Sequence, residues 1–207
     1  MHLLHIEGSP RKQRSASIDV AHAFIDAWKQ RHADGSVDTL DVWTTELPAF
    51  DGAALDAKYA GLTGQTRTPE QERAWDTIRA LADRLFRADV IVVSVPMWNF
   101  GIPYRLKHLI DAVSQKDVLF SFDERGLVGL LGGRRVVVVA ARGIALGPDY
   151  PAQDFDFQGA YMRMWCTMVG IKECHILAVE KTLYGPEADA ESRSAARASA
   201  VALAATF

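Results

Sequence analysis

Two short runs of β-branched residues constrain this chain more than any other feature of its sequence. Val90 to Val95 spells VIVVSV, and Val136 to Ala141 spells VVVVAA. Neither run alternates between apolar and polar residues, as a strand with one solvent-exposed face would. We therefore expect two central parallel strands, each covered by other elements on both faces.

The segments around these runs alternate between strand and helix patterns. Further strands are expected at 2–6, 37–42 and 173–179, and helices beginning at Ser15 or Ser17, at the capping box of Thr68 to Gln71, around Leu106, over 160–169 and at Pro186. This order indicates a doubly wound α/β fold, with a five-stranded parallel sheet flanked by helices. Asp51 to Gln65 contains several glycines and little periodicity, so we expect an irregular excursion over the surface.

Composition and length narrow the class of protein. At 207 residues, one domain covering 1–207 is the simplest prediction. A formal charge of −3 lacks the basic excess of a nucleic-acid binder. Cys166 and Cys174 form no zinc or disulfide pattern, so no metal site is expected. Without a signal peptide or a membrane-length apolar run, we expect a soluble, cytoplasmic protein.

The loops after the first and central strands carry residues suited to a ligand, because doubly wound sheets bind ligands beyond the carboxyl ends of their strands. Ser9 to Ser17 spells SPRKQRSAS, which sets three hydroxyls and three cations at a helix start. A phosphate site and a capped helix with a solvated basic turn both remain open. In the second loop, Asn99 tolerates turn geometry, while Met97, Trp98 and Phe100 offer apolar surface for a planar ligand, or aromatic plugs for the core.

The third loop, Ala140 to Gly147, spells AARGIALG. Its backbone amides could meet the polar edge of a ring system. Taken alone, the loop is better explained by a glycine for turning and an arginine for solubility. The three loops together fit a mononucleotide that carries an aromatic ring system.

At these residues the chain resembles the FMN-dependent NADH azoreductases, within the wider flavodoxin-like family of NAD(P)H quinone reductases. The resemblance is strongest from Met97 to Gly143, with PMWNFGIPYRLKHLIDAV as its distinctive start. The family often has serine where this chain has Ala141, and a second glycine where it has Ile144.

The resemblance implies which residues contact the cofactor and substrate. The FMN phosphate and ribityl chain would lie against Ser9, Ser15, Ala16 and Ser17, and the isoalloxazine against Met97, Trp98, Asn99, Phe100, Ala141, Arg142, Gly143 and Ile144. Phe120 and Phe122 would line the substrate pocket beside the flavin of a dimer partner, although they could equally be two alternate residues of a short hairpin. A homodimer is therefore expected.

The activity implied is FMN-dependent transfer of electrons from NADH or NADPH to quinones and azo compounds, in ping-pong order through flavin N5. Because the flavin carries the chemistry, no catalytic side chain is predicted. His5, His108 and His175 are interpreted as structural or surface groups. The alternative is a flavodoxin-like FMN carrier or redox sensor without turnover. A phosphoester hydrolase lacks the paired nucleophile and base that it would need.

Overall fold

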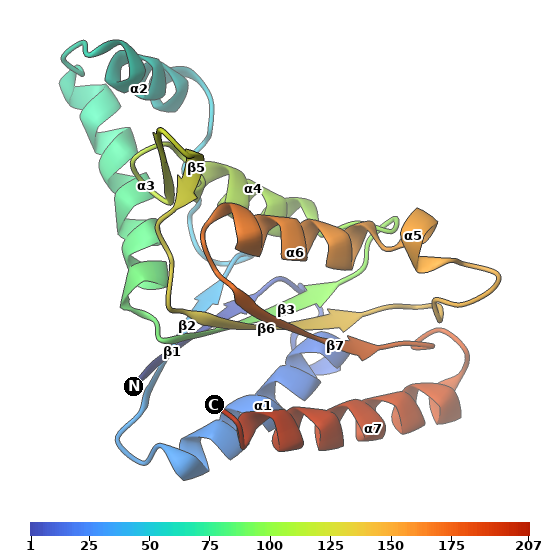
Figure 1. Ribbon diagram of the computed structural model, residues 1–207. Coiled ribbons are helices and arrows are strands. Elements are labelled where there is room, and N and C mark those ends of the chain that lie inside the picture. The colour runs from blue at the N-terminus through green and yellow to red at the C-terminus, as the bar shows by residue number, and fades with distance from the viewer.

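A five-stranded, all-parallel sheet forms the centre of the computed structural model, which describes residues 1–207 (Figure 1). Its strand order is β2-β1-β3-β6-β7. The strands are β1 (His2–Glu7), β2 (Ser36–Asp41), β3 (Val90–Pro96), β6 (Arg135–Ala141) and β7 (Glu173–Val179). The predicted doubly wound sheet is thus confirmed, with both valine-rich runs paired at its centre in β3 and β6.

Helices cover the two faces of this sheet. In Figure 1, α1 (Ala16–Arg31) and α7 (Pro186–Ala204) lie below it. Above it lie α3 (Pro69–Arg87), α4 (Tyr104–Val113) and α6 (Phe157–Met168). The short α5 (Ala152–Phe155) stands beside the carboxyl ends of the strands. None of these helices combines the length and the hydropathy that a membrane span requires.

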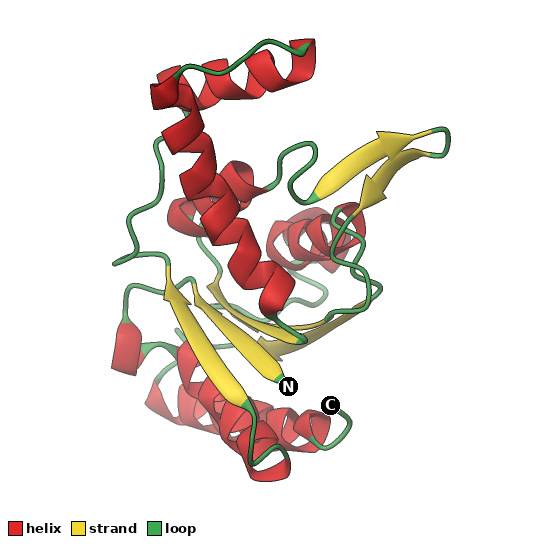
Figure 2. Cartoon of the chain, turned by 90° about the vertical axis from the view of Figure 1, so that its left-hand side faces the viewer, coloured by secondary structure: helices red, strands yellow, loops and turns green.

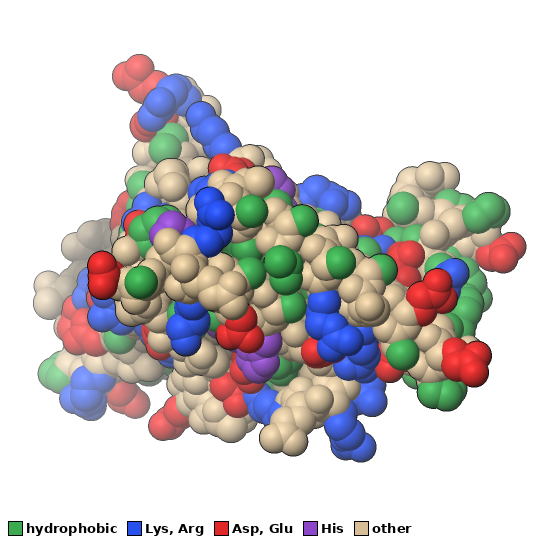
Figure 3. All heavy atoms as spheres, turned by 90° about the horizontal axis from the view of Figure 1, so that it is seen from below, with side chains coloured by type: hydrophobic (Ala, Val, Ile, Leu, Met, Phe, Trp, Pro, Cys, Tyr) green, Lys and Arg blue, Asp and Glu red, His purple; other side chains and the backbone are tan.

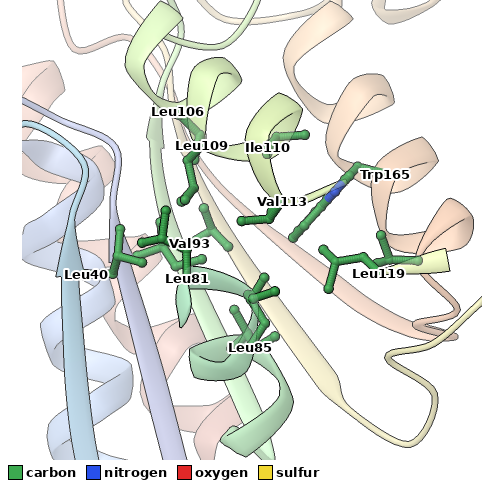
Figure 4. Packing of buried hydrophobic residues seen from close by; sticks show 14 of the residues in the cluster. Leu40, Leu81, Leu85, Val93, Leu106, Leu109, Ile110, Val113, Leu119 and Trp165 are labelled. Carbon is green, nitrogen blue, oxygen red and sulfur yellow. The ribbon is translucent and has the colours of Figure 1, made fainter. Parts of the chain in front are cut away.

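The valine runs are apolar throughout because their side chains enter two separate cores. Successive side chains of a strand point to opposite faces. Ile91 and Val93 therefore pack under α3, α4 and α6, whereas Val90 and Val92 pack against α1 and α7. Figure 4 shows the larger core, where side chains of α3, α4 and α6 converge around Val93.

The two helices between β2 and β3 differ in how well the sequence predicts them. The capping box that begins α3 is confirmed, since Thr68 accepts from the N–H of Gln71 and the Gln71 side chain accepts from that of Thr68. The expected irregular excursion is wrong, because Gly52–Thr63 forms a helix, α2. Its buried side chains are alanines, which pack against α3 with too little bulk to give a clear apolar stripe.

A hairpin of β4 (Phe120–Asp123) and β5 (Gly126–Gly129) projects from the body of the protein (Figure 2). It packs where Gly129 meets Gly170, in the turn between α6 and β7. Because β7 begins only after that turn, the hairpin stands at the amino ends of the strands. It therefore lies at the opposite end of the sheet from the predicted ligand loops (Figure 1).

Candidate functional site

The first loop buries its three serines at the start of α1. Ser15 is the N-cap of the helix, and its Oγ accepts from the N–H of Ile18 at 3.4 Å. The hydroxyls of Ser15 and Ser17 lie 3.1 Å apart. Ser9 is also buried. Hydroxyls beside the free N–H groups of a helix N-terminus form an anion-binding environment.

Lys12 fixes this loop to the sheet. Its Nζ lies 3.0 Å from Glu7 of β1 and 2.5 Å from Asp41 of β2. Burial opposes its charge, but the hydrogen bonds to Asp41 and Glu7 raise the pKa of Lys12. Of the loop's cations, Lys12 is therefore an anchor, while Arg11 is the one that borders the cleft described below.

The second loop makes a tight turn that holds its aromatic rings apart. The backbone groups of Trp98 and Gly101 bond to each other in both directions, at 3.0 and 2.9 Å. Asn99 and Phe100 between them have φ angles of 48° and 67°. Such angles are uncommon outside glycine and persist where the surrounding structure imposes them. The turn directs Phe100 toward Phe155, with ring centroids 5.1 Å apart, and leaves Trp98 at the surface.

Trp98 belongs to an aromatic cluster that the sequence did not predict. Its ring centroid lies 5.6 Å from that of Trp43 and 6.2 Å from that of Tyr104. The indole N–H of Trp43 donates to the carbonyl of Gly8 at 3.0 Å. This cluster therefore joins the segment after β2 to the first two ligand loops and forms one wall at their mouth.

In the third loop, the side chain of Arg142 is not at the surface. It donates to Gln158, Asp156 and Glu180 at 3.1, 3.0 and 3.2 Å, and it is 6% exposed. The interpretation of Arg142 as a solubilising residue is wrong, and its guanidinium faces α6 and β7. The backbone N–H groups of Gly143 and Ile144 make no hydrogen bond within the chain, so they remain free to donate.

A cleft of about 140 Å³ unites the three loops at the carboxyl ends of β1, β3 and β6. Its lining comprises Ser9, Arg11, Ser15, Ala16, Pro96, Met97, Trp98, Ala141, Gly143, Thr182 and Leu183. Seven residues singled out from the sequence therefore meet here. Ser17 lies behind Ser15, and Asn99, Phe100, Arg142 and Ile144 are neighbours of the lining that do not form it.

Comparison with known proteins places this arrangement in a family. The model of the flavodoxin-like fold family matches residues 1–203. The chain belongs to that family.

Flavodoxin-like relatives match nearly the whole chain. It is 51% identical over 205 residues to FMN-dependent NADH:quinone oxidoreductase 2 of Pseudomonas syringae pv. tomato, covering 99% of this chain and 98% of the relative. It is 47% identical over 208 residues to FMN-dependent NADH:quinone oxidoreductase 9 of Burkholderia lata, covering 99% of both. Among solved structures, an FMN-dependent NADH-azoreductase of Bacillus anthracis in complex with FMN has a TM-score of 0.85 at 24% identity, covering 98% of this chain and 99% of that one. The solved structure supports the fold.

Two lining residues of this flavodoxin-like cleft were not predicted from the sequence. Thr182 and Leu183 follow β7, and both are held by backbone bonds to the third loop, at Arg142 and Gly143. Leu183 packs so closely on Gly143 that a Cβ at residue 143 would come within 2.6 Å of it. The rule that ligands lie beyond strand ends would have found these residues had it been applied to the last strand.

Phe120 and Phe122 do not join the cleft of their own chain. They lie on the hairpin at the amino ends of the strands, with ring centroids 5.7 Å apart. Phe122 is 57% exposed. The hairpin agrees with the interpretation of Phe120 and Phe122 as two alternate residues of a short hairpin. A role in substrate binding would require that the hairpin of a second chain reach this cleft.

The remaining titratable groups form no nucleophile with an adjacent base. His108 bonds to the carbonyl of Pro48 at 2.7 Å, and His175 to the carboxylate of Glu173 at 3.0 Å. The hydrogen bond that the Cys166 thiol donates to Cys174, together with burial, raises the pKa of Cys166. The larger hollow of about 480 Å³ between β7 and α7 contains none of the predicted site residues.

Proposed function

We propose that this protein is an FMN-dependent oxidoreductase that passes electrons from NADH or NADPH to quinones and azo compounds. The observation that carries the proposal is the cleft that joins buried serine hydroxyls at a helix N-terminus to an aromatic platform. Its relatives with about half their residues identical are named FMN-dependent NADH:quinone oxidoreductases.

The residues present suit FMN on three counts. Ser9, Ser15 and the first turn of α1 would hold the phosphate, because hydroxyls and free N–H groups satisfy its oxygens. Met97 and Trp98 would lie against the ring. The free N–H groups of Gly143 and Ile144 would face the ring's polar edge. Ala141 and Ile144 still allow this role, since the donors are backbone groups.

When bound, FMN would supply two-electron chemistry at N5. The nicotinamide donor and the electron acceptor would occupy the same binding site beside the ring one after the other, which is a ping-pong order. The chain's own residues orient the bound molecules and shield this binding site from water. Trp43, Trp98 and Tyr104 exclude water from one side, and the backbone donors after β6 stabilise negative charge at the ring edge. Protons for the acceptor come from water.

The decisive experiment is an anaerobic titration of the purified protein. A yellow protein that NADH bleaches near the flavin absorption maximum, and that a quinone restores, supports the proposal. Titration with NADPH gives the donor preference, and parallel lines when both substrates are varied support the ping-pong order. A yellow protein that neither nucleotide reduces would instead be a carrier or sensor, and a protein that does not bind FMN would overturn the proposal.

Ser9→Ala is expected to weaken FMN binding about 10- to 100-fold, because a hydrogen bond to a charged group contributes about 1.5–3 kcal/mol. Ser9 lines the cleft, and its only bond within the chain is a long one from the N–H of Arg11, at 3.4 Å. Fluorescence titration of apoprotein with FMN measures the change. The matched control is Ser199→Ala on the exposed face of α7. Equal affinities for Ser9→Ala and the unmodified protein would remove Ser9 from the site.

We also propose a homodimer in which the hairpin of one chain covers the cleft of the other. The cleft of about 140 Å³ is smaller than the roughly 300 Å³ usual for ligand pockets, so part of a mononucleotide would lie on open surface. Exposed apolar side chains surround it, including Trp98, Tyr104, Leu183 and Tyr184. Such a surface is typical of an interface.

Phe120→Ala is expected to lower kcat/KM for quinones about 3- to 10-fold, because an aromatic pair contributes about 0.5–1.5 kcal/mol. FMN affinity should stay unchanged, since the cleft loops are untouched. Steady-state assays with a series of quinones measure the effect, and Tyr59→Ala on α2 serves as an exposed aromatic control. Unchanged quinone turnover by Phe120→Ala would exclude the hairpin from the pocket.

A further inference from the structure

Three side chains that the cleft does not use converge between β1 and α1. His5 and Glu7 are two residues apart on β1, so both point to the face that α1 covers. His22 extends toward them from α1. One ligand atom from each of the three residues lies within 4.8 Å of the other two.

His5 is held in an orientation suited to a metal ligand. Its Nε2 lies 2.7 Å from the hydroxyl of Ser94 on β3, and both side chains are buried. This bond leaves Nδ1 directed at the carboxylate of Glu7, 3.9 Å away. Histidines that bind metals commonly use one ring nitrogen while the other is hydrogen-bonded in this way.

The cluster is open to solvent on its His22 side. A surface hollow of about 370 Å³ includes Glu7 and His22 in its lining. A tetrahedral zinc site, with bonds of about 2.0–2.2 Å, separates its ligand atoms by about 3.4 Å. The cluster must therefore contract by up to about 1.4 Å. His22 is exposed, so its ring can turn inward. Figure 3 views the molecule from below, the side of α1 and α7, where histidine side chains lie among acidic and basic ones.

The surrounding charges leave one oxygen of Glu7 available. Lys12 pairs with Oε2 of Glu7 and also with Asp41, so its positive charge is shared between two carboxylates. Oε1 faces His5. Asp19, at the rim of the same hollow, is paired with arginines of α7. Two imidazoles, one carboxylate oxygen and a water molecule would complete a tetrahedral set.

We propose that His5, Glu7 and His22 form a binding site for a divalent transition-metal ion of zinc-like chemistry. Nitrogen-rich sets with one carboxylate select such ions over magnesium or calcium. The ion would join β1 to α1 immediately before the loop that carries Ser9. No metal site was expected from the sequence, since the three residues form no local motif and only the packing of β1 on α1 brings them together.

Calorimetric titration of tag-free purified protein with zinc chloride at pH 7.5 tests the proposal. One-to-one binding is expected, with an affinity that His22→Ala lowers at least about 10-fold, since losing even an outer partner of a metal site costs about 10- to 100-fold. Alanine suits this exposed helical position, so the variant should fold. Glu7→Gln is expected to weaken zinc binding as well.

The matched control is His175→Ala, which removes another histidine paired with a glutamate, Glu173. It should bind zinc within about twofold of the unmodified protein. As a second measurement, zinc should raise the Tm of the unmodified protein and of His175→Ala, but not that of His22→Ala. Absence of stoichiometric binding, equal affinity in His22→Ala, or equally tight binding of magnesium chloride would each overturn the proposal.

Discussion

Arg142→Met is expected to lower the free energy of unfolding by about 3 kcal/mol, because it strips the buried carboxylate of Asp156 of its nearer cation and leaves only the exposed Arg163, at 3.5 Å. Asp156 is nearly as buried as Arg142, their side chains being 9% and 6% exposed, and their charged atoms lie 3.0 Å apart. Gln158, which also accepts from Arg142, donates to the carbonyl of Val95 at 2.8 Å. The substitution would therefore disturb the hydrogen bonds at the end of β3 as well as those of the third loop. Urea unfolding followed by circular dichroism measures it.

The control for this substitution is Arg125→Met on the hairpin. Arg125 pairs with Asp123 at the surface, where an ion pair contributes little. A second variant, Arg142→Met with Asp156→Asn, should recover part of the loss, because it removes a buried charge that Arg163 alone compensates and keeps a good N-cap for α6. A loss below about 1 kcal/mol in Arg142→Met would show that water replaces the guanidinium without cost, contrary to the burial argument.

Gly129→Ala is expected to destabilise the protein by about 3 kcal/mol or to detach the hairpin from the body. The added Cβ would overlap backbone atoms of Val169 and Gly170, which cannot move aside as a flexible side chain would. Gly170 itself has a φ of 90°, so the turn that would have to yield is already specialised. Overpacking of rigid sites typically costs about 1–3 kcal/mol, occasionally more. Thermal unfolding and amide exchange of the hairpin measure the effect.

Gly132→Ala, three residues further along, is the matched control. A Cβ there would meet the carbonyl oxygen of Gly170 at 3.9 Å, an ordinary contact, and its backbone is not in the left-handed region. Its stability should be unchanged or slightly raised. If Gly129→Ala were as stable as Gly132→Ala, with the hairpin protected from exchange, the close approach of residues 129 and 170 would be wrong.

The sheet was predictable because local sequence and burial agree there. Uninterrupted valines suit a strand only when both faces are covered, and that pattern located β3 and β6 without any tertiary information. The capping box at Thr68 involves residues within one helical turn, so it too could be predicted from the sequence. In α2 the core contacts are made by Ala54, Ala57 and Ala60, whose small side chains leave no apolar stripe in the sequence.

The site was predictable only where strand ends determine it. Ser9, Ser15, Met97 and Trp98 follow strands and therefore converge. The direction of the Arg142 side chain depends on Asp156 and Glu180, which come from other elements, so residue type alone suggested a surface position. Trp43 was missed because its links to the cleft, a hydrogen bond to the carbonyl of Gly8 and a ring contact with Trp98, both join residues far apart in the sequence.

The placement of cleft and hairpin at opposite ends of one sheet has a genetic consequence. In a dimer that exchanges hairpins, a chain with a damaged hairpin would harm its neighbour's chemistry and leave its own cleft intact. Two defective alleles, one altered in the serine loop and the other at Phe120, could then complement each other in a mixed pair. Substitutions in the hairpin would then change which electron acceptors the enzyme reduces without weakening FMN binding. Close paralogues would diverge in substrate while keeping the same flavin-binding loops.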